Sequence, residues 1–500
     1  MQDNREYSRK PHSDGFSRKA PRSRTERTNR IEGEDSAFSA GHREERPQRR
    51  AAASSSRGEG RRDFPRGEGR TRFKSRPSPK EREESLYQTQ EEHEARIRKG
   101  GFSPFQLRLV NSILTTVLTE HKPLDRAYAL WFSKVKIPPV EQGFLTRQIN
   151  NMFRRLSLYA FVSGLKRPSD FERHVGRLVF SYCAEHDWPL PELEGEEGFD
   201  RRGLKKRLGE ASNNPLMLEG CPVWLEELGK KELGSKWPQI RRELGSESHR
   251  FIRVNTLKCT KDELSKTLSE EGVVTKSVKD APLALEVTSN SALFRTAAFK
   301  AGLFEQQDVG SQKIGEFLDA KPGQRVIDAC AGSGGKTLLL AAAMQGKGTI
   351  TALDTEQWKL EDLKKRARRA GAFNIDPKTI DSTKVIKRLY EHADKVLIDA
   401  PCSGVGVIRR NPDGKWRDGR EKLSEILKVQ QDILERYSKM AKIGGEVVYS
   451  TCSILPSENE KQIETFLKNN AGSFELVEQQ VLYPSDTTDG FFMAKLRRIA

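Results

Sequence analysis

From Arg325 onward, short apolar segments alternate with longer amphipathic ones, and this alternation restricts the fold more than any other feature. The apolar segments read RVIDACA, GTITALD, KVLIDAP and EVVYSTC. Amphipathic stretches such as EQWKLEDLKKRARRAG and LSEILKVQQDILERYSKMA lie between them. Strands buried on both faces of a parallel sheet have such sequences, and parallel strands need long crossover connections. Residues 306–500 are therefore predicted to form an α/β domain with a doubly wound, Rossmann-like sheet.

A helical domain is predicted over residues 96–245. Apolar side chains recur there at three- and four-residue steps, as at Leu107, Val110 and Ile113, and such spacing lines one face of a helix. Arginine and lysine accompany these positions more often than a bundle core requires. The interpretation is a helical bundle with a basic outer face.

A small α/β subdomain is predicted over residues 246–305. RFIRVNT and LALEVT are typical of short strands, and TKDELSKTLSEEG between them has a helical pattern. Thr260 and Glu263 have the spacing of a capping box, and Gly272 is typical of a helix end. Such a small unit buries little surface by itself, so we expect it to pack on the domain that follows.

Residues 1–95 are predicted to be a disordered basic arm. Ile31 and Leu86 are the only branched aliphatic residues in this segment, which cannot bury enough apolar surface to offset its chain entropy. The whole chain carries a net charge of +17, which favours an anionic partner, and RNA is a more common one than an acidic membrane. Composition leaves open whether the arm tethers RNA or is a solvated tail.

Several classes of protein do not fit the sequence. No apolar run approaches the ~18 residues that cross a bilayer, and charged residues interrupt the N-terminus where a secretory signal would be apolar. The six cysteines lack paired metal-ligand spacing, and the eight histidines form no cluster, so no metal site is expected. Free, widely spaced cysteines suit a reducing cytoplasm.

A glycine-rich segment, DACAGSGGKT, follows the first predicted strand of the C-terminal domain. Its glycines would let the backbone turn tightly and approach a ligand. The phosphate-loop pattern needs a glycine where Cys330 stands, and the dinucleotide pattern needs one where Thr337 stands, so both fail. Asp354, some twenty residues on, could accept hydrogen bonds from ribose hydroxyls. These features favour a nucleoside cofactor without pyrophosphate, namely S-adenosyl-L-methionine.

Two cysteines, Cys402 in DAPCSG and Cys452 in STCS, directly follow predicted strands. A single cysteine is most often a small buried apolar residue, but a pair beside a cofactor loop favours nucleophilic chemistry. A thiolate added to C6 of cytosine makes C5 reactive toward a methyl donor, and a second thiol helps to release the product. The pair therefore predicts methylation of cytosine C5.

Four segments resemble the Sun/Nop-type RNA cytosine-C5 methyltransferases, and within them the RsmB-like branch that modifies 16S ribosomal RNA. They are DACAGSGGKT, KVLIDAPCSGVGVIRRNPDGKW, YSTCSILPSENEKQIETFL and DGFFMAKL. RVNTLK and EQQDVGSQ are similar to the family's small subdomain and to the segment that enters its catalytic fold. Residues from about 100 to 220 resemble, more loosely, the NusB-like RNA-binding domain of that branch. The resemblance covers about four-fifths of the chain.

The resemblance implies a role for each matched position. Cys452 would be the nucleophile and Cys402 the cysteine that releases the product. Asp381 would lie near the adenine, and Asp399 near the cofactor methyl group and the target base. The cofactor-binding residues that the resemblance implies are Cys330, Ala331, Gly332, Ser333, Gly334, Gly335, Lys336, Asp354, Asp381 and Asp399. Ser333 stands where the family's AAPGGK has proline, which leaves the turn more flexible.

Two further segments near the cysteines have open interpretations. Arg409, Arg410, Lys415 and Trp416 are expected to grip RNA phosphates and stack a base, and the alternative is a solvated basic loop with the tryptophan turned inward. The PSEN segment 456–459 is expected to start a helix, which is a structural role.

Ribosomal RNA is the expected substrate, and a monomer without metal or membrane attachment is the expected state. The same chemistry on transfer RNA or DNA is one alternative. Related chemistry on DNA uses the Pro-Cys position as the nucleophile, so the STCS cysteine argues against DNA. The other alternative is a non-catalytic RNA-binding assembly factor, against which the intact Cys402, Cys452, Asp354 and Asp399 argue.

Overall fold

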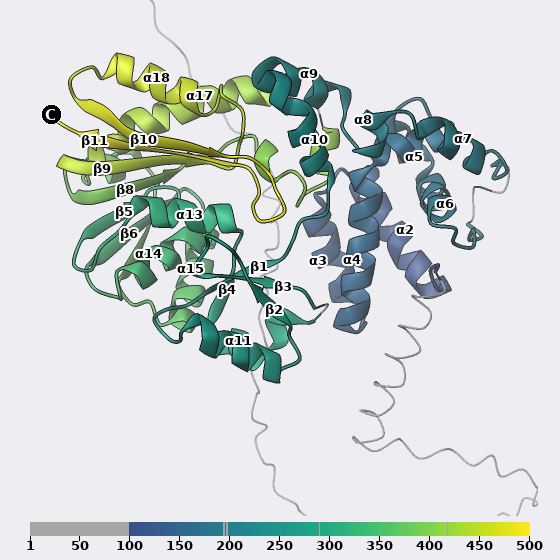
Figure 1. Ribbon diagram of the computed structural model, residues 1–500, viewed down its shortest axis with the longest axis horizontal. Coiled ribbons are helices and arrows are strands. Elements are labelled where there is room, and N and C mark those ends of the chain that lie inside the picture. Colours follow the sequence, from purple (N-terminus) through teal and green to yellow (C-terminus); the bar gives the residue numbers. More distant parts are fainter. Residues whose placement is uncertain (1–99, 194–195, 197–198, 290, 418) are drawn as a thin grey trace, which may run out of the picture. The chain divides into compact units, whose positions relative to one another are not determined.

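The computed structural model describes residues 100–193, 196, 199–289, 291–417 and 419–500. The arm predicted for residues 1–95 lies outside the described residues. Helices α2 to α8 form a bundle (Figure 1). They are α2 (Pro104–Leu118), α3 (Leu124–Lys134), α4 (Pro139–Arg154), α5 (Leu156–Val162), α6 (Val175–Glu185), α7 (Leu204–Ala211) and α8 (Pro215–Leu218).

The bundle has the core that the apolar spacing predicts. Leu107, Val110 and Ile113 of α2 are all buried in one cluster with residues of α3 to α7. α2 begins with a capping box, in which the Ser103 side chain accepts a hydrogen bond from the backbone N–H of Gln106. The helical periodicity is therefore confirmed, whereas likeness to a NusB domain stays a prediction.

Two helices after the bundle, α9 (Val223–Leu233) and α10 (Trp237–Gly245), pack toward the C-terminal part of the chain. Their core residues, such as Leu225 and Trp237, share one apolar cluster with Val405, Ile408 and Leu455. They are the link through which the chain passes from the bundle to the two sheets.

The small subdomain contains a four-stranded antiparallel sheet of order β2-β3-β1-β4. Its elements are β1 (Phe251–Val254), α11 (Lys261–Glu270), β2 (Thr275–Ser277), β3 (Ala284–Val287), α12 (Ala297–Lys300) and β4 (Phe304–Gln306). The capping box of Thr260 and Glu263 is present, and Gly272 follows the helix with a φ of 76°. The predictions for this helix are confirmed.

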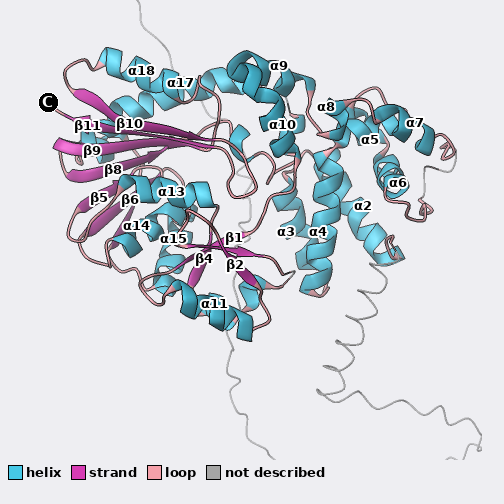
Figure 2. Ribbon diagram, viewed as in Figure 1, coloured by secondary structure: helices cyan, strands magenta, loops and turns pink. Residues whose placement is uncertain are grey.

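A seven-stranded sheet of order β10-β11-β9-β8-β5-β6-β7 forms the C-terminal domain (Figure 2). Its strands are β5 (Arg325–Asp328), β6 (Thr349–Asp354), β7 (Ile375–Thr379), β8 (Ala393–Asp399), β9 (Ala441–Thr451), β10 (Phe474–Leu482) and β11 (Phe491–Arg498). The five strands β5 to β9 run parallel, while β11 is antiparallel to both β9 and β10. The predicted Rossmann-like sheet is confirmed.

Helices cover both faces of this sheet (Figure 1). α13 (Val309–Leu318), α14 (Gly335–Ala343) and α15 (Gln357–Ala370) share one apolar core, and α16 (Thr383–Lys387), α17 (Arg420–Tyr437) and α18 (Glu460–Asn469) share the other. The strand order reverses between β5 and β8, where the connections leave toward opposite faces. Ligands of doubly wound sheets bind at such a point, beyond the carboxyl ends of the strands.

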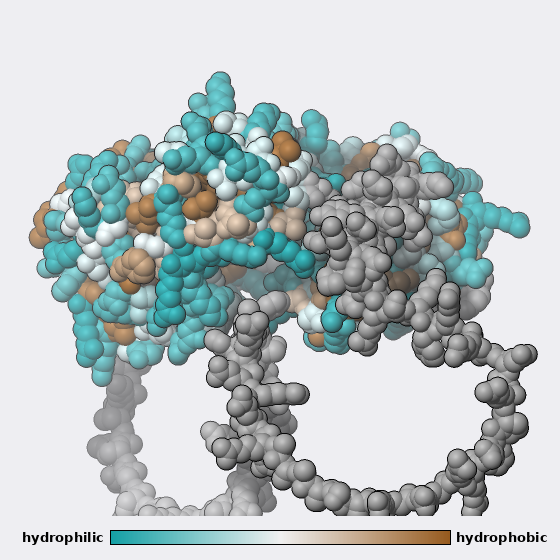
Figure 3. Space-filling model, turned by 90° about the horizontal axis from the view of Figure 1, so that it is seen from below, coloured by the Kyte–Doolittle hydropathy of each residue, from teal (hydrophilic) through white to brown (hydrophobic). Residues whose placement is uncertain are grey.

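One face of the described residues is predominantly polar (Figure 3). The face drawn in Figure 3 carries hydrophilic side chains over most of the part that is not grey, with separate smaller apolar areas. Within the described part of the chain, the helices are all too short or too polar to cross a membrane.

Candidate active site

The glycine loop lies at the point where the strand order reverses, between the end of β5 and the start of α14. Gly332 and Gly334 have φ values of 54° and 86°, a region in which residues with a side chain are strained. A Cβ atom at Gly334 would collide with Leu363, whereas one at Gly332 would enter open space. The loop therefore packs tightly against α15 on one side and leaves a backbone cradle on the other.

Asp354, the last residue of β6, lies beside this cradle. Its Oδ2 atom accepts a hydrogen bond from the backbone N–H of Gly332 at 2.9 Å, and its Oδ1 atom accepts one from the N–H of Glu356 at 2.9 Å. Lys359 lies 3.6 Å away. The carboxylate is thus fixed in place at the mouth of the loop.

Asp328, the last residue of β5, has an unsatisfied acceptor under the same loop. Its Oδ2 accepts a hydrogen bond from Thr337 at 2.7 Å, while the buried Oδ1 has no partner among the described residues. Burial raises the pKa of this carboxyl to about 6. A buried acceptor without a donor is uncommon in proteins and is a reason to expect a ligand. The sequence reasoning did not single out Asp328, although it begins the quoted DACAGSGGKT motif.

Lys336 and Asp399 form an ion pair between the first turn of α14 and the end of β8, with Nζ and Oδ2 2.6 Å apart. Ser450 donates a hydrogen bond to the other oxygen of Asp399 at 2.9 Å. Burial, the largest single influence, disfavours the ammonium form of Lys336, but Asp399, Cys452 and Asp328 together outweigh it and leave the lysine pKa raised. Because Cys452 is one of the groups that raise the pKa of Lys336, the ammonium and the Cys452 sulfur interact electrostatically.

The two cysteines meet just beyond the ends of the adjacent parallel strands β8 and β9. Their Sγ atoms are 3.3 Å apart, within hydrogen-bond distance for sulfur. The hydrogen bond to Cys452, together with burial, holds the pKa of Cys402 well above its usual range. The two thiols therefore share a hydrogen bond in which either sulfur can be the donor.

Glu458 holds the two cysteine loops together, a role that the sequence reasoning missed. Its side chain is fully buried, and it accepts hydrogen bonds from the N–H of Ser403 at 2.7 Å, from Gln430 at 3.1 Å and from the hydroxyl of Ser453. The segment does precede α18, as expected. A carboxylate six residues after Cys452, inside an otherwise apolar or small segment, is the signal that could have identified it.

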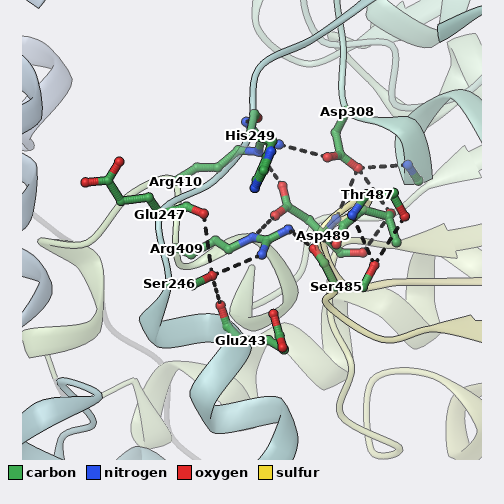
Figure 4. A network of polar contacts seen from close by, with 12 residues as sticks. Glu243, Ser246, Glu247, His249, Asp308, Arg409, Arg410, Ser485, Thr487 and Asp489 are labelled. Atoms are coloured by element: carbon green, nitrogen blue, oxygen red, sulfur yellow. Dashed lines mark hydrogen bonds and ion pairs between the residues drawn. The ribbon is translucent and has the colours of Figure 1, made fainter. Parts of the chain in front are cut away.

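The expected RNA contacts of the basic loop after Cys402 are wrong. The Arg409 side chain is 1% exposed and pairs with the fully buried Asp489, and Arg410 pairs with Asp489 and with Asp308 (Figure 4). Lys415 is also buried, and the indole of Trp416 donates a hydrogen bond to a backbone carbonyl of α4. Buried carboxylates need cationic partners, so these side chains hold the interior instead of facing solvent.

The remaining predicted residues lie in the same region of the fold or at its edge. Burial and the three nearby carboxylates hold the pKa of the Cys330 thiol well above its usual range. Asp381 lies exposed after β7 and accepts a hydrogen bond from Ser382 at 3.0 Å. Among the described residues, no group of histidine, cysteine or acidic side chains could hold a metal ion.

The charges of the cradle select among nucleotide-like cofactors. Asp328, Asp354 and Asp399 lie around the loop and outnumber the two lysines beside them, Lys336 and Lys359, so the remaining negative charge disfavours a pyrophosphate. The positive sulfonium and ammonium groups of S-adenosyl-L-methionine suit them, and its ribose hydroxyls can donate to Asp354. Bound there, it would bring its methyl group toward the two cysteines. The fold and the site thus define an S-adenosyl-L-methionine-dependent methyltransferase.

Comparison with known proteins narrows this class. Residues 316–497 match the 16S rRNA methyltransferase RsmB/F family, and residues 221–293 match the ferredoxin-like domain of RsmF/B-like methyltransferases. The ribosomal RNA small subunit methyltransferase B of Yersinia enterocolitica is 32% identical over 60% of this chain and 70% of its own length. The chain therefore belongs to the RsmB/F family.

Two further similarities agree with this assignment. A probable ribosomal RNA small subunit methyltransferase B from Synechocystis is 31% identical over 55% of this chain, and the match spans 66% of that protein's length. The crystal structure of a methyltransferase homologue from Pyrococcus horikoshii is 29% identical, with a TM-score of 0.51 over 57% of this chain and 98% of that one.

Proposed function

We propose that this protein methylates carbon 5 of a cytosine in small-subunit ribosomal RNA, with Cys452 as the nucleophile and Cys402 as the cysteine that releases the product. The observation that carries the proposal is the 3.3 Å contact between the two sulfur atoms beside a carboxylate cradle. Membership of the RsmB/F family supports ribosomal RNA as the substrate. The target base would have to be flipped out of its RNA to reach sulfurs below the surface.

The proposed chemistry begins at Cys452. Its thiolate adds to C6 of the cytosine, and the displaced electrons make C5 nucleophilic. Bound S-adenosyl-L-methionine supplies the methyl group that C5 takes. The ammonium of Lys336 would stabilise the thiolate before the attack, because the two groups interact electrostatically.

Cys402 completes the cycle in this proposal. Its largest pKa-raising interaction, the hydrogen bond to Cys452, disappears once Cys452 is bonded to the base, so ionisation of Cys402 becomes easier at that stage. The ionised Cys402 then takes the C5 proton. The electron pair of the broken C–H bond re-forms the C5–C6 double bond and expels Cys452 as a thiolate.

The proposal gives the other predicted residues supporting roles. The segment from Cys330 to Lys336 and Asp354 would hold the amino acid and ribose parts of the cofactor, and Asp381 would lie near its adenine. Asp399 would face the methyl group and the edge of the base, held there by Ser450 and Lys336. The helical domain, proposed to be NusB-like, would bind RNA outside the catalytic centre.

The decisive experiment uses the Cys402→Ala variant with small-subunit ribosomal RNA and S-adenosyl-L-methionine. Without the second cysteine the methylated base cannot leave Cys452, so a protein–RNA adduct that survives a denaturing gel should accumulate. Sequencing the trapped RNA would identify the cytosine. Cys452→Ala is the matched control and should give neither adduct nor 5-methylcytosine.

Each alternative has its own outcome in this experiment. Adduct formation by Cys452→Ala instead of Cys402→Ala would reverse the roles of the two cysteines. Adducts on transfer RNA alone would change the substrate but not the chemistry. A wild-type protein that binds RNA but neither binds the cofactor nor methylates any RNA would be an assembly factor.

A further inference from the structure

A cavity of about 650 Å³ lies between the helical bundle and the small sheet, apart from the cysteines and the glycine loop. Its walls come from α3, α4, the segment around residues 247–250, residues 291–295 and the end of β4. Pockets that hold nucleotide-sized ligands have volumes from roughly 300 to 1,000 Å³, so one nucleotide would fit.

The charge of the cavity wall is strongly positive. Arg147, Arg154, Arg250 and Arg295 line it, against the single carboxylate of Glu247. That carboxylate is already engaged, because Asn151 donates a hydrogen bond to it at 2.7 Å and Arg147 lies 4.0 Å away. The cavity therefore holds more positive charge than its own residues neutralise.

Arg250 shows this imbalance most clearly. Its guanidinium has no hydrogen-bond or ion-pair partner among the described residues, although the residue is only partly exposed. Burial, and then the nearby charge of Arg147, lower its pKa. Arg295, which also lines the cavity and is exposed, likewise pairs with no described side chain. A partly buried cation beside another cation is costly unless an anion joins them.

Aromatic rings accompany these arginines. Phe294 borders the cavity with 53% of its surface exposed, and its ring is braced edge-on by Phe299 at a centroid distance of 5.0 Å. Tyr128 and Phe132 stack on each other at 5.5 Å in the opposite wall. Exposed rings next to arginines are the combination with which proteins bind unpaired nucleotides, since bases stack and phosphates pair.

Two walls of the cavity connect to the catalytic loops. Arg154 donates a hydrogen bond at 3.1 Å to the backbone carbonyl of Arg409, in the segment that follows Cys402. The second connection starts at Gln306, the lining residue at the end of β4. The side chain of the next residue, Gln307, accepts a hydrogen bond from Arg253. Arg253 also donates a hydrogen bond at 2.9 Å to the backbone carbonyl of Gly335, in the glycine loop. A strand of RNA held in the cavity would thus lie against the elements that carry the active site.

We propose that this cavity binds an unpaired nucleotide of the substrate RNA, separate from the target cytosine. Arg250 and Arg295 would bind its flanking phosphates, and Phe294 would stack on its base. The inference rests on the proposed function in one respect, that the substrate is RNA. It assigns RNA binding to a surface different from the basic loop that the sequence suggested.

The test is binding of a fluorescent single-stranded RNA to the full chain over a range of salt concentrations. Each phosphate contact contributes about 0.7 to the slope of log affinity against log salt for single strands, so the Arg250→Ala/Arg295→Ala variant should lose about 1.4 of slope. Its affinity near physiological salt should fall at least tenfold. Phe294→Ala should weaken binding about fivefold or more with an unchanged slope, and Phe294→Tyr should restore it.

The matched control removes two exposed arginines of the catalytic domain, Arg325→Ala/Arg368→Ala, and should change affinity less than twofold. Equal losses in both double variants would mean that only net charge matters, and would overturn the proposal. So would displacement of the RNA by an acidic peptide that binds the same arginines more tightly. Absence of methylation by the wild type would refute the proposed function and leave this binding result standing.

Discussion

The free Oδ1 atom of Asp328 links stability to cofactor binding at the scale of one residue. The pKa of this buried carboxyl is about 6, against about 4 for an exposed aspartate, so the folded protein binds the proton more tightly than the unfolded chain. The resulting stabilisation is fully present below pH 4 and is lost as the pH rises through 6. Two pKa units correspond to about 3 kcal/mol.

Replacing Asp328 by asparagine should therefore make the protein more stable at pH 7.5, by about 1–3 kcal/mol, and weaken its binding of S-adenosyl-L-methionine. The amide cannot ionise, so the urea midpoint should change less between pH 5 and 7.5 than it does in the wild type. Urea denaturation at the two pH values and calorimetric titration of the cofactor measure both effects. A variant less stable than the wild type at neutral pH would show that the ionised carboxylate is satisfied in the fold.

Glu458 acts at the scale of elements, because it joins the loops that follow β8 and β9 to α17. We expect Glu458→Gln to lower kcat about a hundredfold. The glutamine amide cannot accept every hydrogen bond that the Glu458 carboxylate accepts from Ser403, Gln430 and Ser453, so the two cysteine loops should shift. A displacement of about 1 Å at a reacting group lowers a rate by about that factor. The KM for the cofactor should stay near the wild-type value, because Glu458 does not touch the glycine loop.

Adduct yield separates positioning from simple destabilisation. In the Cys402→Ala background, Glu458→Gln should slow adduct formation by a similar factor. Glu464→Gln, on the exposed side of α18, is the control and should leave kcat unchanged. A Glu458→Gln protein with wild-type kcat would show that the two loops hold their positions without this carboxylate.

Four of the five parallel strands could be predicted from the sequence, whereas the edge strand β7 and the antiparallel pair β10 and β11 could not. β5, β6, β8 and β9 are apolar runs because both of their faces are covered, and all four were predicted. β10 was missed because its middle, from Glu475 to Gln480, is exposed and four of those six residues are polar, so it lacks the continuous apolar signal of a buried strand. A hydrophobic pattern in the sequence arises where side chains are buried, and an edge strand such as β10 buries few of its side chains.

The candidate site shows the same limit. Residues with distinctive chemistry at strand ends, such as Cys452 and Asp354, could be recognised locally. The pairing of Arg409 with Asp489 could not, because the two residues are 80 positions apart and only the fold brings the carboxylate to the arginine. The basic segment after Cys402 was therefore predicted to face RNA, although Arg409 and Arg410 form ion pairs with carboxylates of the protein itself.

At the scale of the whole molecule, the same misjudged segment joins the helical bundle to the catalytic domain. Asp413 accepts a hydrogen bond from the N–H of Leu124 at the start of α3, and Trp416 packs against the bundle core. The bundle is thereby anchored on the loop that continues from Cys402. RNA held by the bundle would be placed relative to the cysteines through this contact.

Trp416→Ala should therefore uncouple the two domains. Loss of a buried tryptophan costs about 3–5 kcal/mol, and the partly buried Trp416 should approach the lower value, with the loss falling on the contact between the domains. Differential scanning calorimetry should show the thermal transition of the wild type separating into two, and the KM for RNA should rise while cofactor affinity is kept. Trp358→Ala, on the exposed surface of α15, is the control and should leave the transition unchanged. Two domains that still melt together in Trp416→Ala would mean that α9, α10 and the hydrogen bond from Arg154 to the Arg409 carbonyl suffice to couple them, since those contacts also bridge the bundle side and the sheet.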